Sequence, residues 1–377
     1  MPDTPKSRLA LRSLLQLIEE IDARVLGPEW GIDLGSVPEG IHSIMHLLQG
    51  GLYTYYEDDA EHPRFRRIVS PTRKFTGDNA DAIYYDTAID PTRAYRVRGE
   101  TAGAVYVSLT IESGAQEGRF GSRTSGVIND TAFDISPDGR FEVFFGGPPQ
   151  PRNWIALPPD AARITTRHYF EEQRAAAANP DKLIRLDVEV LGGAVAPPPA
   201  PDDESVAAGI DRVVNFVRTR TLGMGPPGNR EQPAFVSVTP NQFPPPVKPG
   251  DFALAAADAA YSMAPFVLGP DDALVMTGRW PQCRCANVSL WNRHMQTFDF
   301  AHRQVSLNRR QTQSDADGRF RMVIAHRDPG VPNWLDTEGR AFGIVFWRFM
   351  LPEGDIETPT ATVIPFAEIA RADPAAR

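Results

Sequence analysis

The chain has 377 residues, of which 42% are hydrophobic and 23% are charged, and it contains 30 glycines and 35 prolines. This length suffices for two or three domains with cores of their own, and the glycine and proline content is typical of a chain with many turns. A formal net charge of −9 argues against nucleic acid as a partner, because such a protein needs a basic face to displace counterions from phosphates.

Helical segments are predicted at the start of each half of the chain. Apolar residues recur at helical spacing over residues 9–21 and again over residues 40–52. In the second half, a helix is expected over residues 206–217, after an acidic start at residues 202–203, and another over residues 252–263.

Short runs of alternating apolar and polar residues predict β-strands after these helices. They cover residues 95–99, 104–111, 163–169, 274–278, 288–291 and 343–349. Strands this short, separated by turn signals, favour a sandwich or jelly roll over a fold in which strands and helices alternate.

The second half of the sequence repeats the first. Asp138-Gly139-Arg140-Phe141 returns as Asp317-Gly318-Arg319-Phe320, 179 positions later, and Asn153-Trp154 returns as Asn333-Trp334, 180 positions later. Apolar residues alternate on both sides of Asp-Gly in the first copy and after Asp-Gly in the second. This pattern predicts a β-hairpin, since glycine adopts positive φ without a steric penalty. We expect each tryptophan to be a mostly buried anchor. Other pairs at similar spacing are Pro91 with Pro270, Gly99 with Gly278, Asn129 with Asn308 and Arg167 with Arg348.

The predicted fold is therefore mainly β, of the sandwich or jelly-roll type, with a few helices and two internal repeats. Residues 1–190 are expected to form the first repeat, with the N-terminal helices and one sandwich. Residues 191–203, with the run Ala-Pro-Pro-Pro-Ala-Pro, are expected to form a stiff linker. Residues 204–377 are expected to form the second repeat, again with helices and a sandwich.

Several segments of the first repeat are similar to a known family. They are Asp78-Asn79-Ala80-Asp81-Ala82-Ile83-Tyr84, Ile89-Asp90-Pro91, Tyr95-Arg96-Val97-Arg98-Gly99, Asp138-Gly139-Arg140, Asn153-Trp154 and Arg167-His168-Tyr169. The chain resembles, through these segments, the bacterial domain of unknown function (DUF) 1214. The resemblance covers residues 78–170 and, more weakly, residues 260–350, where the Asn-x-Asp-x-x-Tyr segment is missing. It implies two tandem jelly-roll-like copies in a bacterial protein of a kind often encoded beside catabolic genes for small apolar molecules, and it implies no reaction.

Two histidines and two cysteines deserve a test as metal ligands. His42 and His46 are four residues apart on a predicted helix, so their rings share a face, as an acid/base or metal-binding pair requires. Their apolar neighbours also fit a packed, hydrogen-bonded pair, and no third ligand is evident. Cys283 and Cys285 lack the spacing of a metal site or a disulfide, so we expect no metal and a reducing compartment.

The main candidate site is a polar and aromatic cluster after the first helices, formed by Asn79, Asp81, Tyr84, Tyr85 and Asp86. Aspartate and tyrosine together can donate and accept protons, and the second repeat lacks equivalent acids, so we expect a pocket lined by first-half residues, which a second-half loop at residues 294–302 could close. Arg167 and Arg348 lie on apolar strands, where an arginine usually has a carboxylate partner or faces a pocket. Catalytic roles are predicted for Asp81, Tyr84, His42 and His46. Substrate contacts are predicted for Asn79, Tyr85, Asp86, Arg167, His294 and His302.

The predicted function is that of an acid/base enzyme of the lyase, hydratase or hydrolase type, without a cofactor. Its substrate would be a largely apolar metabolite that carries a hydroxyl or carbonyl group. The sequence has no P-loop, no dinucleotide-binding glycine motif and no nucleophile elbow. The alternatives are a non-catalytic protein that binds such a molecule or a carbohydrate, and a scaffold for another enzyme. The absence of a signal peptide or long apolar run predicts a cytoplasmic protein with no membrane partner, and the chain could be a homo-oligomer.

Overall fold

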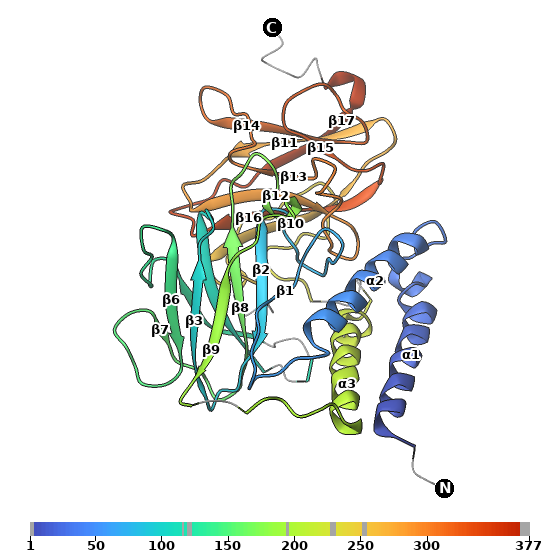
Figure 1. The fold of residues 1–377 in the computed structure, drawn as a ribbon. Helices are drawn as coiled ribbons and strands as arrows, with labels where there is room; N and C mark the ends of the chain where they lie inside the picture. The colour runs from blue at the N-terminus through green and yellow to red at the C-terminus, as the bar shows by residue number, and fades with distance from the viewer. Residues whose placement is uncertain are drawn as a thin grey trace.

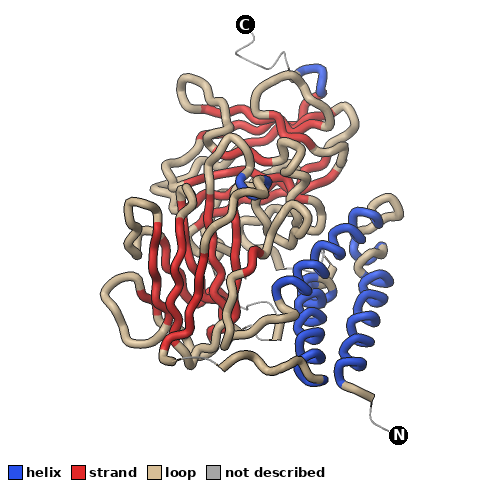
Figure 2. The backbone as a smooth tube through the Cα atoms, viewed as in Figure 1, coloured by secondary structure: helices blue, strands red, loops and turns tan. Residues whose placement is uncertain are grey.

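Two β-sandwiches and a layer of three α-helices make up the described part of the protein, a computed structural model (Figure 1). The structure describes residues 4–114, 117–118, 123–193, 196–226, 231–250 and 255–369. The helices lie beside the first sandwich, and the second sandwich lies across one end of it (Figure 2). The prediction of a mainly β fold is confirmed. Among the described residues, no helix is both long and apolar enough to cross a membrane.

The first sandwich packs a five-stranded sheet on a four-stranded sheet. Its strands are β1 (Arg66–Arg67), β2 (Ala82–Ala88), β3 (Ala94–Glu100), β4 (Tyr106–Ser113), β5 (Arg123–Asn129), β6 (Arg140–Phe145), β7 (Trp154–Ile155), β8 (Ala161–Tyr169) and β9 (Leu186–Leu191). The larger sheet has the order β1-β2-β8-β4-β5 and the smaller one β7-β6-β3-β9. Alternate residues of β3 and β6 point into the core, where Tyr95, Val97, Val143 and Phe145 are fully buried.

The second sandwich has the same strand order as the first. Its strands are β10 (Ala259–Val267), β11 (Asp272–Arg279), β12 (Cys285–Trp291), β13 (Ser306–Asn308), β14 (Arg319–Ala325), β15 (Trp334–Asp336), β16 (Phe342–Met350) and β17 (Thr360–Pro365). The sheets are β10-β16-β12-β13 and β15-β14-β11-β17, so β10 takes the place of β2, and β17 the place of β9. Trp347 is fully buried in this core and stacks on Phe320.

The predicted repeat is visible in individual backbone positions. Gly139 and Gly318 have φ angles of 82° and 83° in turns that lead into β6 and β14. Asn153 and Asn333 have φ angles of 57° and 58°, immediately before the parallel edge strands β7 and β15. Asparagine tolerates this left-handed conformation, and each side chain accepts a hydrogen bond from a loop amide, of Asp134 in one half and of the equivalent Gln313 in the other.

Trp154 and Trp334 are mostly buried, as predicted, although each begins an edge strand, where its indole nitrogen donates to a backbone carbonyl. Two local predictions were wrong. The segment before each Asp-Gly turn forms a single bridge, Ile135 with Phe141 in the first half, and β6 pairs with β3 and β7 instead. The helix predicted at residues 252–263 is replaced by strand β10, which pairs with β16 along its whole length. Residues 252–254 of that prediction lie outside the described part.

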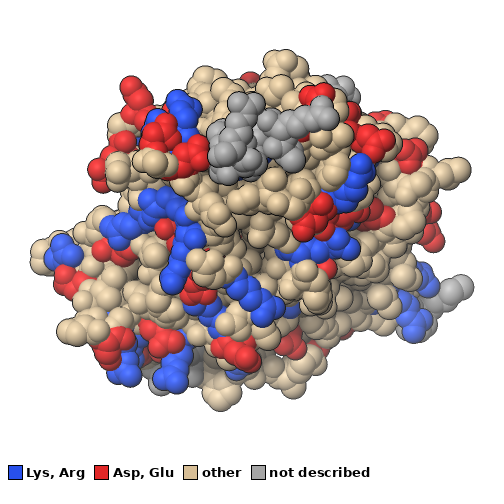
Figure 3. All heavy atoms as spheres, turned by 90° about the horizontal axis from the view of Figure 1, so that it is seen from above, with Lys and Arg blue, Asp and Glu red and all other residues tan. Residues whose placement is uncertain are grey.

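Helices from both halves form one layer. They are α1 (Lys6–Arg24), α2 (Val37–Thr54) and α3 (Asp203–Arg220), and short 3₁₀ turns cover Pro28–Trp30, Ala176–Ala178, Leu222–Met224 and Phe366–Glu368. α3 starts with a capping box, in which the Asp202 carboxylate accepts the Ser205 amide at 2.8 Å. It packs against α1 and α2 of the first half, where Gly51 lets the ring of Phe216 approach closely. Seen from above, basic and acidic side chains are intermixed on the surface (Figure 3).

Candidate functional site

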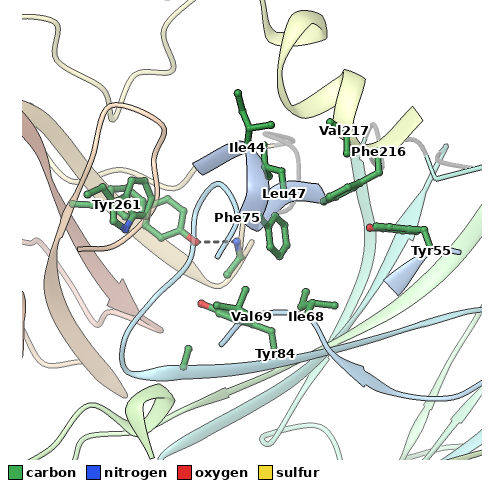
Figure 4. Close-up of a cluster of buried hydrophobic side chains, with 14 of the residues drawn as sticks. Ile44, Leu47, Tyr55, Ile68, Val69, Phe75, Tyr84, Phe216, Val217 and Tyr261 are labelled. Carbon is green, nitrogen blue, oxygen red and sulfur yellow. Dashed lines mark hydrogen bonds between the residues drawn. The ribbon is translucent and has the colours of Figure 1, made fainter. Parts of the chain in front are cut away.

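A largely apolar cavity of about 370 Å³, here called the junction cavity, lies where the two sandwiches meet the helical layer. Its wall comes from β2 and β8, from β10, β12 and β16, and from loops next to α3. Phe75 is part of this wall and lies between Leu47 of α2 and Tyr84 of β2 (Figure 4). The cavity has the size and the apolar character of a small-molecule site. Other apolar lining residues are Val69, Met224, Phe235, Trp291 and Phe346.

A second space of about 520 Å³, here called the outer chamber, adjoins the junction cavity. It extends between the helices and the second sandwich, past His294 and Phe342. The two spaces are neighbours and share lining residues, among them Thr76, Arg220, Met224, Met263 and Met295.

Each sandwich contributes a tyrosine and an arginine to the junction cavity at equivalent positions. Tyr84 on β2 is the cross-strand partner of Arg167 on β8, and Tyr261 on β10 is the cross-strand partner of Arg348 on β16. All four residues line the cavity, and both arginines are only 3% exposed. The polar part of the wall thus follows from the internal repeat. Directly opposite residues of an antiparallel pair point to the same face, which brings each tyrosine beside its arginine.

Arg167 has its counter-charge within the protein. Its guanidinium lies 3.5 Å from the Glu112 carboxylate and donates to the Thr110 hydroxyl. Glu112 is 1% exposed, and burial raises the pKa of its carboxyl, an effect that Arg167 opposes. The hydroxyls of Thr110 and Thr124 each donate to this carboxylate at 2.9 Å. The first arginine is therefore part of a buried, hydrogen-bonded ion pair.

Arg348 has different surroundings. Its Nη2 donates to the backbone carbonyls of Gly77 and Asp78, each at 3.0 Å. Its guanidinium carbon lies 5.0 Å from the ring centre of Trp291 and 4.2 Å from that of Phe346. Within the described part of the chain, its Nη1 is buried without a hydrogen-bond partner, and no carboxylate oxygen lies within 4.0 Å of its nitrogens.

Asp78 is the buried carboxyl group on the cavity wall. It is 2% exposed; its Oδ1 accepts the Thr297 amide at 2.8 Å, while its Oδ2 has no partner among the described residues. Burial raises the pKa of Asp78, although the nearby Lys74 ammonium opposes this shift. Burial also raises the pKa of Tyr84, so its hydroxyl stays neutral and can donate a hydrogen bond.

The structure brings three of the predicted site residues to these spaces. Tyr84 and Arg167 line the junction cavity, and His294 lines the outer chamber. The expectation that the main pocket is lined by first-half residues, with at most a closing loop at residues 294–302 from the second half, is wrong, since Tyr261 and Arg348 from strands of the second half also form its wall. Asp78, Arg220, Tyr261 and Arg348 were not among the predicted site residues. Arg348 could have been identified from the sequence, because its spacing from Arg167 matches the internal repeat.

Asp81 and Asn79 lie instead at the contact between the two sandwiches. The Asn287 amide donates to the Asp81 carboxylate at 2.8 Å and to the Asn79 side-chain oxygen at 2.6 Å. The Asn308 amide donates to the other oxygen of Asp81 at 3.0 Å. Burial raises the pKa of Asp81 to about 6. These contacts join a first-half carboxylate to two second-half strands, outside both the junction cavity and the outer chamber.

The remaining predicted residues are dispersed. Asp86 accepts from Arg163 and from the Thr165 hydroxyl within the first sandwich, and the Tyr85 hydroxyl accepts the Ile184 amide at 3.4 Å. These contacts stabilise the first sandwich and its adjoining loop.

The predicted histidines do not meet at the cavity. The rings of His42 and His46 are 4.4 Å apart; His42 is exposed, while His46 accepts the Lys74 amide at 3.0 Å. Burial and the neighbouring His42 lower the pKa of His46 to about 4. His302 is exposed and pairs with Asp299. Among the described residues, no group of three His, Cys, Asp or Glu side chains could hold a metal ion.

Comparisons with known proteins identify a family segment and a shared fold. No curated protein matches the chain. An uncharacterized protein from Burkholderia cenocepacia has a similar structure, with a TM-score of 0.80 and 23% identity over 96% of this chain and 98% of the other. A protein from Vibrio parahaemolyticus aligns with a TM-score of 0.47 and 13% identity over 85% of this chain and all of the other.

The family match lies in the second sandwich. Residues 286–354 match the family described as "Protein of unknown function (DUF1214)", within and just beyond the region of the weaker predicted resemblance. The match covers β12 to β16, which include Trp291 and Arg348 of the junction cavity. The chain therefore carries one recognised DUF1214 segment, at residues 286–354.

Proposed function

We propose that the protein binds a small, largely apolar molecule with one polar end in the junction cavity. The observation that carries this proposal is the wall itself, in which aromatic and aliphatic side chains of both sandwiches surround a few polar groups. Such a combination excludes water from most of a ligand and orients it by a small number of hydrogen bonds. The neighbouring outer chamber supplies a route between the helices and the second sandwich.

A neutral apolar probe tests this proposal. N-phenyl-1-naphthylamine, whose fluorescence rises in apolar surroundings, is expected to bind saturably with one probe per chain. Val236 lines both spaces, so Val236→Trp should fill part of both and reduce binding about tenfold or more. Val363→Trp is the matched control, because Val363 is exposed on β17, away from both spaces. Absence of saturable binding, or equal binding by Val236→Trp, would contradict the proposal.

A second candidate is acid/base catalysis at the same cavity, with Asp78 as the proton-transferring group. It is favoured by the unpartnered Oδ2 of Asp78 on the cavity wall and by the raised pKa of this carboxyl. Asp78 thus replaces the dispersed set of Asp81, His42 and His46 in this role. Exchange of the α-protons of 2-decanone in D₂O, followed by NMR, should be accelerated by the protein and lose about 10²-fold or more in Asp78→Asn. Equal rates in both proteins would remove Asp78 from this role.

A further inference from the structure

We infer that the polar end of the ligand is a carboxylate, which Arg348 binds in the place that Glu112 takes beside Arg167. This inference rests on the proposed function, because it specifies the ligand of the junction cavity. It follows from a difference between equivalent positions of the two sandwiches. The two arginines occupy equivalent strand positions, yet only Arg167 has a carboxylate oxygen within 4.0 Å of its nitrogens in the described part of the chain.

Strand register identifies what the second half has in place of Glu112. Arg167 lies opposite Ser108 on β4, and Arg348 lies opposite Asn287 on β12. Four residues further along these strands are Glu112 and Trp291. The position that holds the carboxylate in the first sandwich therefore holds an indole ring in the second.

The second change lies on the arginine's own strand. Two residues before Arg167 is Thr165, and two residues before Arg348 is Phe346. Arg348 is thus in contact with two aromatic rings where Arg167 has a carboxylate and hydroxyl groups nearby. Cation–π contacts hold the guanidinium plane but do not neutralise its charge. Burial of such a charge is costly unless an anion accompanies it.

The other charges on the wall do not supply this anion. The Asp78 carboxylate is not within 4.0 Å of the Arg348 nitrogens, although its backbone carbonyl accepts from Nη2. Arg220, from the end of α3, also lines the wall; burial lowers its pKa to about 9, so it remains protonated at neutral pH and supplies no anion. Glu231 also lines the cavity but is exposed. The buried Nη1 of Arg348 is therefore a donor without a hydrogen-bond partner among the described residues.

A carboxylate fits this donor better than a neutral group or a dianion. One uncompensated guanidinium balances one negative charge, and its planar nitrogens match the planar oxygens of a carboxylate. The rest of the cavity, with Phe75, Phe235 and Val69, offers only apolar contacts to the body of the ligand. The expected ligand class is therefore an alkyl or aryl carboxylate.

Titration calorimetry with four decyl compounds tests the inference. Decanoate is expected to bind at least about tenfold more tightly than decanol, decylamine or decyl phosphate, since a hydrogen bond to a charged group contributes about 1.5–3 kcal/mol, or roughly 10- to 150-fold. Arg348→Gln should remove this preference, so that decanoate binds no more tightly than decanol. Arg319→Gln, on the half-exposed surface of β14, is the matched control and should keep it.

A second variant rebuilds the arrangement of the first sandwich. Trp291→Glu places a carboxylate at the position equivalent to Glu112, so it should exclude decanoate even though Arg348 is intact. Equal affinities of the unmodified protein for decanoate and decanol, or unchanged decanoate binding by Arg348→Gln, would overturn the carboxylate inference and leave the apolar site standing. Tighter binding of decyl phosphate would also overturn it. If neither decanol nor N-phenyl-1-naphthylamine binds, the proposed function itself fails.

Discussion

Replacement of each cavity arginine by methionine should affect stability very differently, although the two side chains occupy equivalent positions. Arg167→Met leaves the buried Glu112 carboxylate without its cation, with only the Thr110 and Thr124 hydroxyls as donors. Removal of one partner from a buried ion pair typically costs about 3–5 kcal/mol. Arg348→Met removes a buried cation that has no carboxylate partner among the described residues. The lost hydrogen bonds to two carbonyls, about 1.5–3 kcal/mol each, are then offset by the several kcal/mol that burial of the charge costs.

The expected difference between the two variants is thus about 2 kcal/mol or more, with Arg348→Met close to the unmodified protein. Urea unfolding of the ligand-free protein, followed by circular dichroism, measures it. The double variant Glu112→Gln with Arg167→Met is the control, because it removes both charges and should recover part of the loss. Equal destabilisation by Arg167→Met and Arg348→Met would refute the reasoning, and with it the claim that the two arginines differ in their counter-charge.

Two further predictions concern groups outside the cavity. His168 on β8 is fully buried, and burial lowers its pKa to about 4, so the unfolded chain binds a proton at this residue more readily than the folded protein does. The protein should therefore lose about 3 kcal/mol of stability as the pH falls from 6.5 to 4. Urea unfolding of His168→Gln at several pH values should lack this loss. An unchanged pH dependence would show that His168 is not buried in its neutral form. Asp81→Ala should cost about 2–4 kcal/mol, because it leaves the amides of Asn287 and Asn308 without their acceptor, while binding of N-phenyl-1-naphthylamine stays the same. Loss of binding with unchanged stability would instead restore the catalytic role predicted for Asp81.

Most of the architecture could be predicted because the second half of the sequence repeats motifs of the first. The spacing of the Asp-Gly and Asn-Trp motifs paired the strands of the two halves, and the apolar periodicity of α1, α2 and α3 predicted their positions. Strand β10 was missed, since its alanine-rich start has no clear strand periodicity. Its conformation is decided by pairing with β16, a contact between residues about 80 positions apart.

The candidate site could be predicted only in part, because some of its features depend on contacts between residues far apart in the sequence. Tyr84 was identified as part of a polar and aromatic cluster, and Arg167 was identified by its charge on an apolar strand. The role of Arg348 depends on the replacement of a carboxylate by Trp291, and this becomes visible only once the register of β12 and β16 is known. Asp81 was assigned to the site because it is acidic, but its partners Asn287 and Asn308 lie more than 200 positions away and hold it between the sandwiches.

The crossing of α3 into the first half's helical layer has a consequence for how the chain folds during synthesis. α1 and α2 emerge from the ribosome before the first sandwich, but the helix that covers them is translated only after it. The sides of α1 and α2 that α3 covers therefore stay uncovered while some 150 further residues are made. The nascent first half is consequently an unfinished folding unit, and release of α3 from the ribosome is the event that completes it.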